Sequence, residues 1–156
     1  MKIGILTFHR SYNYGAFMQC FSLVNRIKKD FPEHTVEVID YTSAKILKMY
    51  EHEYERLKDE TIIEDVKERK KHFATCQKIL PLSPKRFESD DFSEVVGYMN
   101  ENYDAVVVGS DAVWNWIVRG FPNLYFLKDY KGLKFSYAAS VHGMNYQNIS
   151  QEQKNI

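Results

Sequence analysis

The sequence predicts an α/β protein in which helices flank an open, mostly parallel sheet. Apolar runs at residues 2–8 and 104–108 each end abruptly in a polar loop. The run at 104–108 is unbroken and valine-rich, which is typical of a strand buried on both faces of a parallel sheet. A helical pattern also separates 2–8 from a second strand-like run at 35–41, and a right-handed crossover would make these strands parallel.

The first predicted strand, 2–8, leads through a loop at 11–15 into a predicted helix that ends at Pro32. Apolar side chains recur there at three- and four-residue steps, which defines one helical face. They are Phe17, Cys20, Phe21, Val24, Ile27 and Phe31. The second strand, 35–41, follows.

Residues 43–80 form a charged helical insertion, either a helical hairpin or one long broken helix. Two apolar stripes run through it, and Thr61–Glu64 has the pattern of a capping box at a helix start. We interpret the charge run 65–71 as a solvated face.

Pro81–Pro84 ends this region, and a further helix runs to about Asn102 before the strand at 104–108. Residues 124–127 fit a short edge strand or a turn of helix, and 134–140 fit another strand. A helix start at Ser150 leads us to expect more chain beyond Ile156. We therefore expect residues 1–156 to be part of a larger protein.

Composition narrows the class of partner. A chain of 156 residues with a formal net charge of zero gives no reason to expect nucleic acid as a partner. No apolar run reaches the ~18 residues of a membrane span. The start at Met1 resembles a strand rather than a signal peptide, and Cys20 and Cys76 fit buried thiols, so we expect a cytoplasmic protein. No metal-ligand spacing is present, and we expect no metal.

The loop after the first strand is one candidate site. Gly15 permits close backbone approach, and the free amides of the following helix would attract an anion or a hydroxyl oxygen. Asn13 and Tyr14 would contact the ligand there. The alternative is that Asn13 only caps the helix, since asparagine is a favoured cap.

The loop after 104–108 is the second candidate, because ligands bind at the carboxyl ends of strands in open α/β sheets. Asp111 could act as a base or orient a hydroxyl group, or could cap a helix. Trp114 could stack on a sugar or pack in the core. His9 follows the first strand and could exchange a proton, although a structural histidine is the more common outcome.

Several blocks, in order, resemble the polysaccharide pyruvyl transferase family. They are Gly4–Phe8, Ser11–Ala16 with Gln19, Val36–Tyr41, Asp104–Asp111 with Val113–Asn115, and Ser136–Ser140. The chain departs from the expected pattern at Ala112, where we expect glutamine, and at Val141–His142, where we expect an aromatic residue and glycine.

This resemblance implies that residues 1–156 form the amino-terminal, Rossmann-like lobe of a two-lobed, glycosyltransferase-like (GT-B) architecture, and that the second lobe is absent here. The family's activity moves the pyruvyl group of phosphoenolpyruvate onto a sugar and forms a ketal. The partners implied are a saccharide acceptor and phosphoenolpyruvate as donor, with no cofactor. Association with further copies of the chain stays open.

We assign Asp111 and His9 as catalytic candidates, and a group of loop residues as substrate-binding candidates: Asn13, Tyr14, Gly15, Gly109, Ser110, Trp114 and Asn115. Only Arg10 and Arg119 are candidate cations at the rim, so we expect no turnover by this chain alone. Two alternatives stay open: a non-catalytic module that binds a sugar, a nucleotide or a partner subunit, and a small flavodoxin-like domain.

Overall fold

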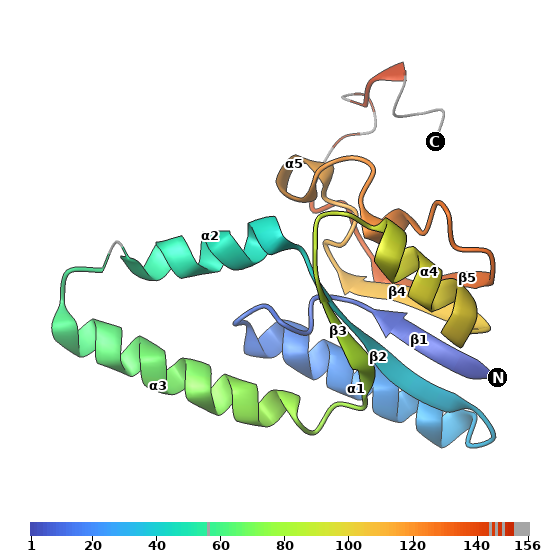
Figure 1. Ribbon diagram of the computed structural model, residues 1–156, viewed down its shortest axis with the longest axis horizontal. Helices are drawn as coiled ribbons and strands as arrows, with labels where there is room; N and C mark the ends of the chain where they lie inside the picture. Colours follow the sequence, from blue (N-terminus) through green and yellow to red (C-terminus); the bar gives the residue numbers. More distant parts are fainter. Residues whose placement is uncertain (56, 144, 146, 148, 152–156) are drawn as a thin grey trace.

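The computed structural model describes residues 1–55, 57–143, 145, 147 and 149–151, apart from the side chains of residues 51, 53–55, 118 and 119. The described residues form a five-stranded parallel sheet with the strand order β3-β2-β1-β4-β5 (Figure 1). The predicted α/β class with a Rossmann-like parallel sheet is confirmed. The strands are β1 (Lys2–Leu6), β2 (Thr35–Thr42), β3 (Leu82–Glu88), β4 (Ala105–Asp111) and β5 (Leu133–Ala139).

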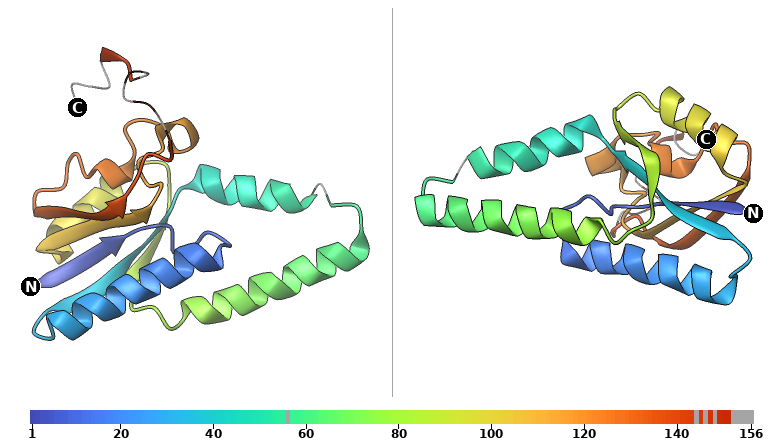
Figure 2. Two further views of the ribbon diagram at one scale, coloured as in Figure 1. Left: turned by 180° about the vertical axis from the view of Figure 1, so that it is seen from behind. Right: turned by 60° about the horizontal axis from the view of Figure 1, so that its bottom comes forward.

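Helices cover both faces of this sheet. Helix α1 (Tyr14–Asp30) connects β1 to β2 on one face, and α4 (Ser93–Asn102) precedes β4 on the other, as the right-hand view of Figure 2 shows. The short helix α5 (Trp116–Arg119) and the 3-10 turn η1 (Leu124–Phe126) lie between β4 and β5. Residues 124–127 therefore form a turn of helix, which was one of the two predicted alternatives.

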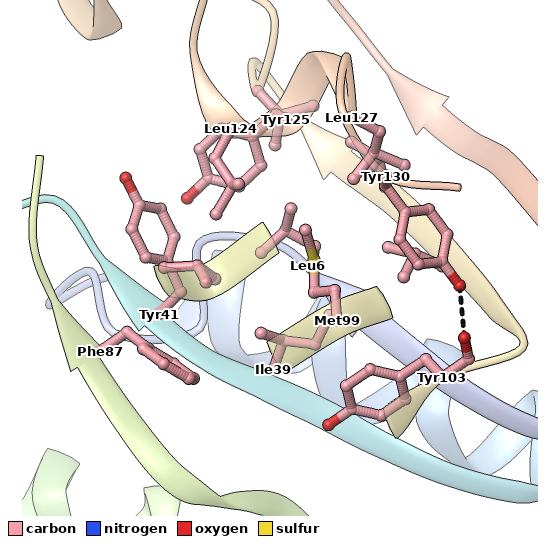
Figure 3. Packing of buried hydrophobic residues seen from close by; sticks show 14 of the residues in the cluster. Leu6, Ile39, Tyr41, Phe87, Met99, Tyr103, Leu124, Tyr125, Leu127 and Tyr130 are labelled. Carbon is pink, nitrogen blue, oxygen red and sulfur yellow. Dashed lines mark hydrogen bonds between the residues drawn. The ribbon is translucent and has the colours of Figure 1, made fainter. Parts of the chain in front are cut away.

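The core has two layers, one on each face of the sheet. On the α1 side, Phe17 and Val24 pack against Ile5. On the α4 side, a larger aromatic cluster joins α4 to η1 and the following loop, and a hydrogen bond of 2.8 Å from the Tyr130 hydroxyl to the Tyr103 carbonyl closes it (Figure 3). Because strand side chains alternate between faces, β1 and β4 contribute to both layers.

Residues 43–80 contain a helical hairpin of α2 (Ala44–Glu55) and α3 (Glu60–Gln77), which was one of the two predicted alternatives. It forms the connection from β2 to β3 and extends away from the carboxyl ends of the strands (Figure 1). The predicted capping box is wrong. Helix α3 begins two residues earlier, with Asp59 in place of Thr61 as the N-cap, and the Asp59 carboxylate accepts hydrogen bonds from the Thr61 and Ile62 amides.

Strand β3 was not predicted. Its sequence contains Pro84 and several charged residues, and only Ser83 and Phe87 are buried within it. The strand lies at the edge of the sheet, where a proline and exposed charges are tolerated.

The predicted helix from Ser150 falls mainly on residues 152–156, which lie outside the described residues. Along the described parts of the chain, no helix combines the length and apolar character that a bilayer crossing requires.

Candidate functional site

A hollow of about 250 Å³ lies at the carboxyl ends of β1 and β4, and we call it the central hollow. It brings together three predicted site residues from two separate loops, namely Asn13, Asp111 and Asn115. Its described lining consists of Phe8, Ser11, Asn13, Tyr50, Asp111, Ala112, Asn115 and His142. The predicted convergence of the two loops at one edge of the sheet is therefore observed.

Asp111 is the last residue of β4 and has an unusual backbone. Its φ of +95° is rare for a residue with a side chain and costs about 1–3 kcal/mol, a kind of strain that clusters at functional sites. Its Oδ1 accepts a hydrogen bond of 2.6 Å from the Ala112 amide, which holds the half-buried carboxylate at the wall of the hollow.

Gly109 supports this turn of the chain. Its φ is +110°, and a Cβ atom there would lie 2.3 Å from the Tyr137 carbonyl oxygen in β5. The Thr7 hydroxyl also donates a buried hydrogen bond of 3.0 Å to the Ser110 carbonyl, which ties the end of β4 to β1. Gly109 thus shapes the strand end and does not line the central hollow.

Asn13 caps helix α1 and also lines the central hollow. Its Oδ1 accepts a hydrogen bond of 3.2 Å from the Ala16 amide, so it is the N-cap of α1. The same residue lines the central hollow, where its side chain is exposed. The cap fixes the side chain beside the hollow, because leaving the position would free a helix amide.

The other two candidates in the 11–15 loop, Tyr14 and Gly15, face different surfaces. Tyr14 lines a cleft against α3, together with Tyr12, which was not a candidate. Gly15 lines a larger hollow of about 640 Å³ between α1 and β5, which we call the outer hollow. Ser110, which is 8% exposed, lines the outer hollow as well. Of the predicted substrate-binding residues, Asn13 and Asn115 line the central hollow, Tyr14 lines the cleft against α3, and Gly15 and Ser110 line the outer hollow.

His9 lies in a buried network. Its side chain is fully buried, its Nε2 lies 3.0 Å from Asp40 Oδ1, and its Nδ1 lies 3.3 Å from the Thr7 carbonyl oxygen. It does not appear among the residues that line the described hollows. In this position the ring holds the start of the loop and has no direct path to a ligand.

Arg10 is committed to the same network and is not a rim cation. Two of its guanidinium nitrogens, Nε and Nη2, donate to the two carboxylate oxygens of Asp40. Gln77 at the end of α3 accepts a longer contact of 3.4 Å from Arg10 Nη1, and its own amide donates 2.9 Å to the His9 carbonyl. The side chain of Arg119, the other predicted cation, lies outside the described residues.

Asp40 is the centre of this network. It is 4% exposed, and burial alone would raise the pKa of its carboxyl group. Hydrogen bonds from His9 and Arg10, together with their charges, outweigh that effect and lower its pKa to about 2. The ionised carboxylate therefore anchors the chain segment that immediately precedes the site loop.

Trp114 packs in the core and forms no wall of the central hollow. Its Nε1 donates a hydrogen bond of 3.1 Å to the Tyr125 carbonyl, and its ring stacks on Phe126 with centroids 6.4 Å apart. Core packing was the alternative for this residue, and the structure supports that alternative.

Tyr50 and His142 are among the residues that line the central hollow but were not predicted as candidates. Tyr50 comes from α2, so only the tertiary path of the hairpin brings it to the hollow. His142 was noted only as a departure from the family pattern, although it lies three residues after Ala139, the last residue of β5, at the same edge of the sheet. It is exposed and has a φ of +55°.

Within the described residues, no three His, Cys, Asp or Glu side chains are grouped so that they could hold a metal ion. Cys20 and Cys76 form no disulfide. Cys20 is buried as predicted, whereas Cys76 is only half-buried. The polar side chains that line the central hollow are carboxylate, amide, hydroxyl and imidazole groups.

Comparison with known proteins agrees with the resemblance in the sequence. No curated protein matches the chain at a significant level of similarity. A model of the family described as polysaccharide pyruvyl transferase matches residues 13–155, which is most of the chain. The chain belongs to the polysaccharide pyruvyl transferase family.

Proposed function

We propose that this chain supplies the acceptor-binding lobe for transfer of a pyruvyl group from phosphoenolpyruvate to two hydroxyl groups of a sugar. The observation that carries the proposal is the central hollow, where Asp111, Asn13 and Asn115 meet at the carboxyl edge of the sheet. Carboxylate and amide groups at such an edge are suited to hold and deprotonate hydroxyl groups.

The reaction requires no redox step. A proton adds to C3 of phosphoenolpyruvate, and a sugar hydroxyl adds to C2 and loses its proton. The bond from C2 to the phosphate oxygen then breaks, phosphate leaves, and the second hydroxyl closes the ketal and loses its proton. The two sugar hydroxyl groups lose two protons in total. The balance places one proton on C3 and the other on a base or the phosphate, so general acid–base groups are the main requirement.

Within this scheme, Asp111 is the base that accepts a hydroxyl proton, and Asn13 and Asn115 orient the sugar. His142 is the imidazole that an incoming ligand can reach, since it is exposed and lines the hollow. We assign His142 the acid role first considered for His9, and we assign His9 to positioning the loop through Asp40.

A donor site needs cations for the carboxylate and phosphate of phosphoenolpyruvate. The described lining of the central hollow contains no lysine or arginine, and Arg10 is held by Asp40. We therefore propose that a second lobe of GT-B type completes the donor site, and that this chain alone has no turnover. Phosphoenolpyruvate is a cytoplasmic metabolite, so a cytoplasmic location goes with this proposal.

One observation favours the alternative of a module that docks a partner subunit. Leu133, Phe135 and Tyr137 occupy alternate positions of the edge strand β5 and are 54%, 55% and 59% exposed. Apolar side chains exposed in this way can mark an interaction surface. This surface adjoins the outer hollow through Tyr137 and is separate from the described lining of the central hollow.

Calorimetric titration distinguishes the acceptor-binding lobe from the module that docks a partner subunit. Neutral disaccharides and phosphoenolpyruvate are titrated separately into the wild-type chain and into Asp111→Asn, which keeps a side-chain oxygen to accept from the Ala112 amide. We expect saturable binding of a saccharide, weakened at least tenfold in Asp111→Asn, and no binding of phosphoenolpyruvate.

Binding of neither compound favours the docking module. Binding of phosphoenolpyruvate, or ketal formation by the isolated chain, contradicts the proposal that the donor site lies elsewhere. A thermal unfolding curve for Asp111→Asn shows whether a change in binding is due to lost structure.

A further inference from the structure

A second cleft lies beside the central hollow, between the site loop and helix α3. It has a volume of about 280 Å³, at the small end of ligand pockets, which suits a single ring. We call it the aromatic cleft. It is lined by Tyr12, Tyr14, Val66, Arg69, Lys70 and Phe73.

Three aromatic rings form the walls of this cleft. Phe73 is 2% exposed, whereas Tyr12 and Tyr14 are 43% and 52% exposed. Both tyrosine rings meet Phe73 edge to face, with centroid distances of 5.7 Å and 5.5 Å. A buried core ring thus supports two partly exposed rings, each of which carries a hydroxyl group.

Cations lie at the rim of the cleft. Lys70 Nζ is 5.2 Å from the centroid of the Tyr12 ring, and Arg69 lines the cleft while its guanidinium lies 3.7 Å from Asp65. The run 65–71 was interpreted as a solvated face, and most of it is exposed, including Arg69. Lys70 is half-buried, and both residues line the cleft because the hairpin brings α3 back against the site loop.

The aromatic cleft and the central hollow are contiguous. The Tyr12 ring of the cleft contacts the Tyr50 ring of the hollow, with centroids 5.7 Å apart. Ser11 and Asn13, the chain neighbours of Tyr12, line the hollow. A chain of sugar residues that passes over this loop would therefore meet the hollow with one residue and the cleft with the next.

We propose that the aromatic cleft binds an acidic sugar residue next to the residue that receives the pyruvyl group. A pyranose ring has an apolar C–H face that can pack on Tyr12 or Tyr14 and hydroxyl edges that can bond to their phenol groups. A carboxylate or phosphate on that ring would be attracted by Lys70 and Arg69. This inference rests on the proposed acceptor function of the central hollow and names the class of acceptor.

The test compares two disaccharides that differ by one acidic group. Cellobiose and cellobiuronic acid are titrated into the chain at low and at high salt. The variant Lys70→Gln removes a cation of the cleft, and Lys67→Gln is the matched control, because Lys67 is 61% exposed, pairs with Glu64 and does not line the cleft. Tyr14→Ala removes part of the aromatic wall.

We expect the acidic disaccharide to bind the wild type about three- to fivefold more tightly than cellobiose, the effect of a partly exposed ion pair of about 0.6–1 kcal/mol. High salt and Lys70→Gln should remove this preference, while Lys67→Gln should keep it. Tyr14→Ala should weaken both sugars.

Equal binding of the two sugars, or an equal effect of Lys67→Gln and Lys70→Gln, overturns the proposal for the cleft. If both sugars still bind and Asp111→Asn weakens them, the acceptor function of the central hollow survives that result. If neither sugar binds, both proposals fail.

Discussion

The substitution Asp40→Asn probes the buried network that holds the site loop. It keeps the shape of the side chain but removes the charge that His9 and Arg10 contact. It also converts one carboxylate oxygen into a donor, which then faces donors of Arg10 or His9. We expect a large loss of stability with little change in the fold.

The pKa of Asp40 sets the scale of this loss. Its ordinary pKa is 3.8, and the network lowers it to about 2. At about 1.4 kcal/mol per pH unit, the network stabilises the folded state by about 2–3 kcal/mol. Breaking one partner of a buried ion pair costs about 3–5 kcal/mol in other proteins, so we expect Asp40→Asn to cost about 2–4 kcal/mol.

The sign of the pH dependence follows from the lowered pKa. The contribution of Asp40 is fully present above about pH 4 and is lost as the pH falls from about 4 towards 2, because the unfolded state then binds the proton first. The wild type should therefore lose about 2–3 kcal/mol more than Asp40→Asn over this range.

Urea unfolding followed by tryptophan fluorescence measures both effects. With a typical slope of about 2 kcal/mol per molar urea, Asp40→Asn should lower the midpoint at pH 7 by about 1–2 M. The control is Asp30→Asn, because the pair of Asp30 with Arg26 is exposed at the end of α1 and should contribute about 0.5 kcal/mol or less. A loss below 0.5 kcal/mol for Asp40→Asn, or equal losses for the two variants, would refute the reasoning.

Other predictions concern the glycine turn, the helix cap and the cysteines. In urea unfolding, Gly109→Ala should lower the free energy of unfolding by at least about 3 kcal/mol, because a Cβ there meets the backbone of β5 and φ is positive. The control Gly97→Ala, which lies in open space on α4, should raise the free energy of unfolding by up to about 1 kcal/mol. Equal effects would contradict this account. Asn13→Ala should lower the free energy of unfolding by about 0.5–2 kcal/mol, and Asn13→Asp should keep most of the wild-type stability. An unchanged stability of Asn13→Ala would contradict a stabilising role for the cap. Burial raises the pKa of Cys20 to about 12, so a thiol reagent at pH 8 should label the half-buried Cys76 first, and faster labelling of Cys20 would contradict its burial.

The fold was predictable wherever burial leaves a periodic pattern. Strands β1, β2 and β4 and helix α1 bury continuous or regularly spaced apolar residues, and each was located from the sequence. Strand β3 was not located, because an edge strand buries few side chains. It is a strand because it pairs with β2. Nothing local to Pro84 indicates that pairing.

The site was predictable at the level of loops but not of side chains. Asp111 and Asn13 were found because strand ends and helix starts have sequence signals. The ion pair between Arg10 and Asp40 was not predicted, because the two residues are 30 positions apart and meet only in the folded sheet. Trp114 was placed at the site because the sequence could not show that its ring stacks on Phe126.

The most direct test of the central claim is an NMR titration of the isotopically labelled chain with a neutral disaccharide. The account predicts that the amide signals of Asp111, Asn115 and His142, which line the central hollow, shift together and saturate. Shifts confined to Gly15 and Ser110 would place the ligand in the outer hollow and would contradict the account.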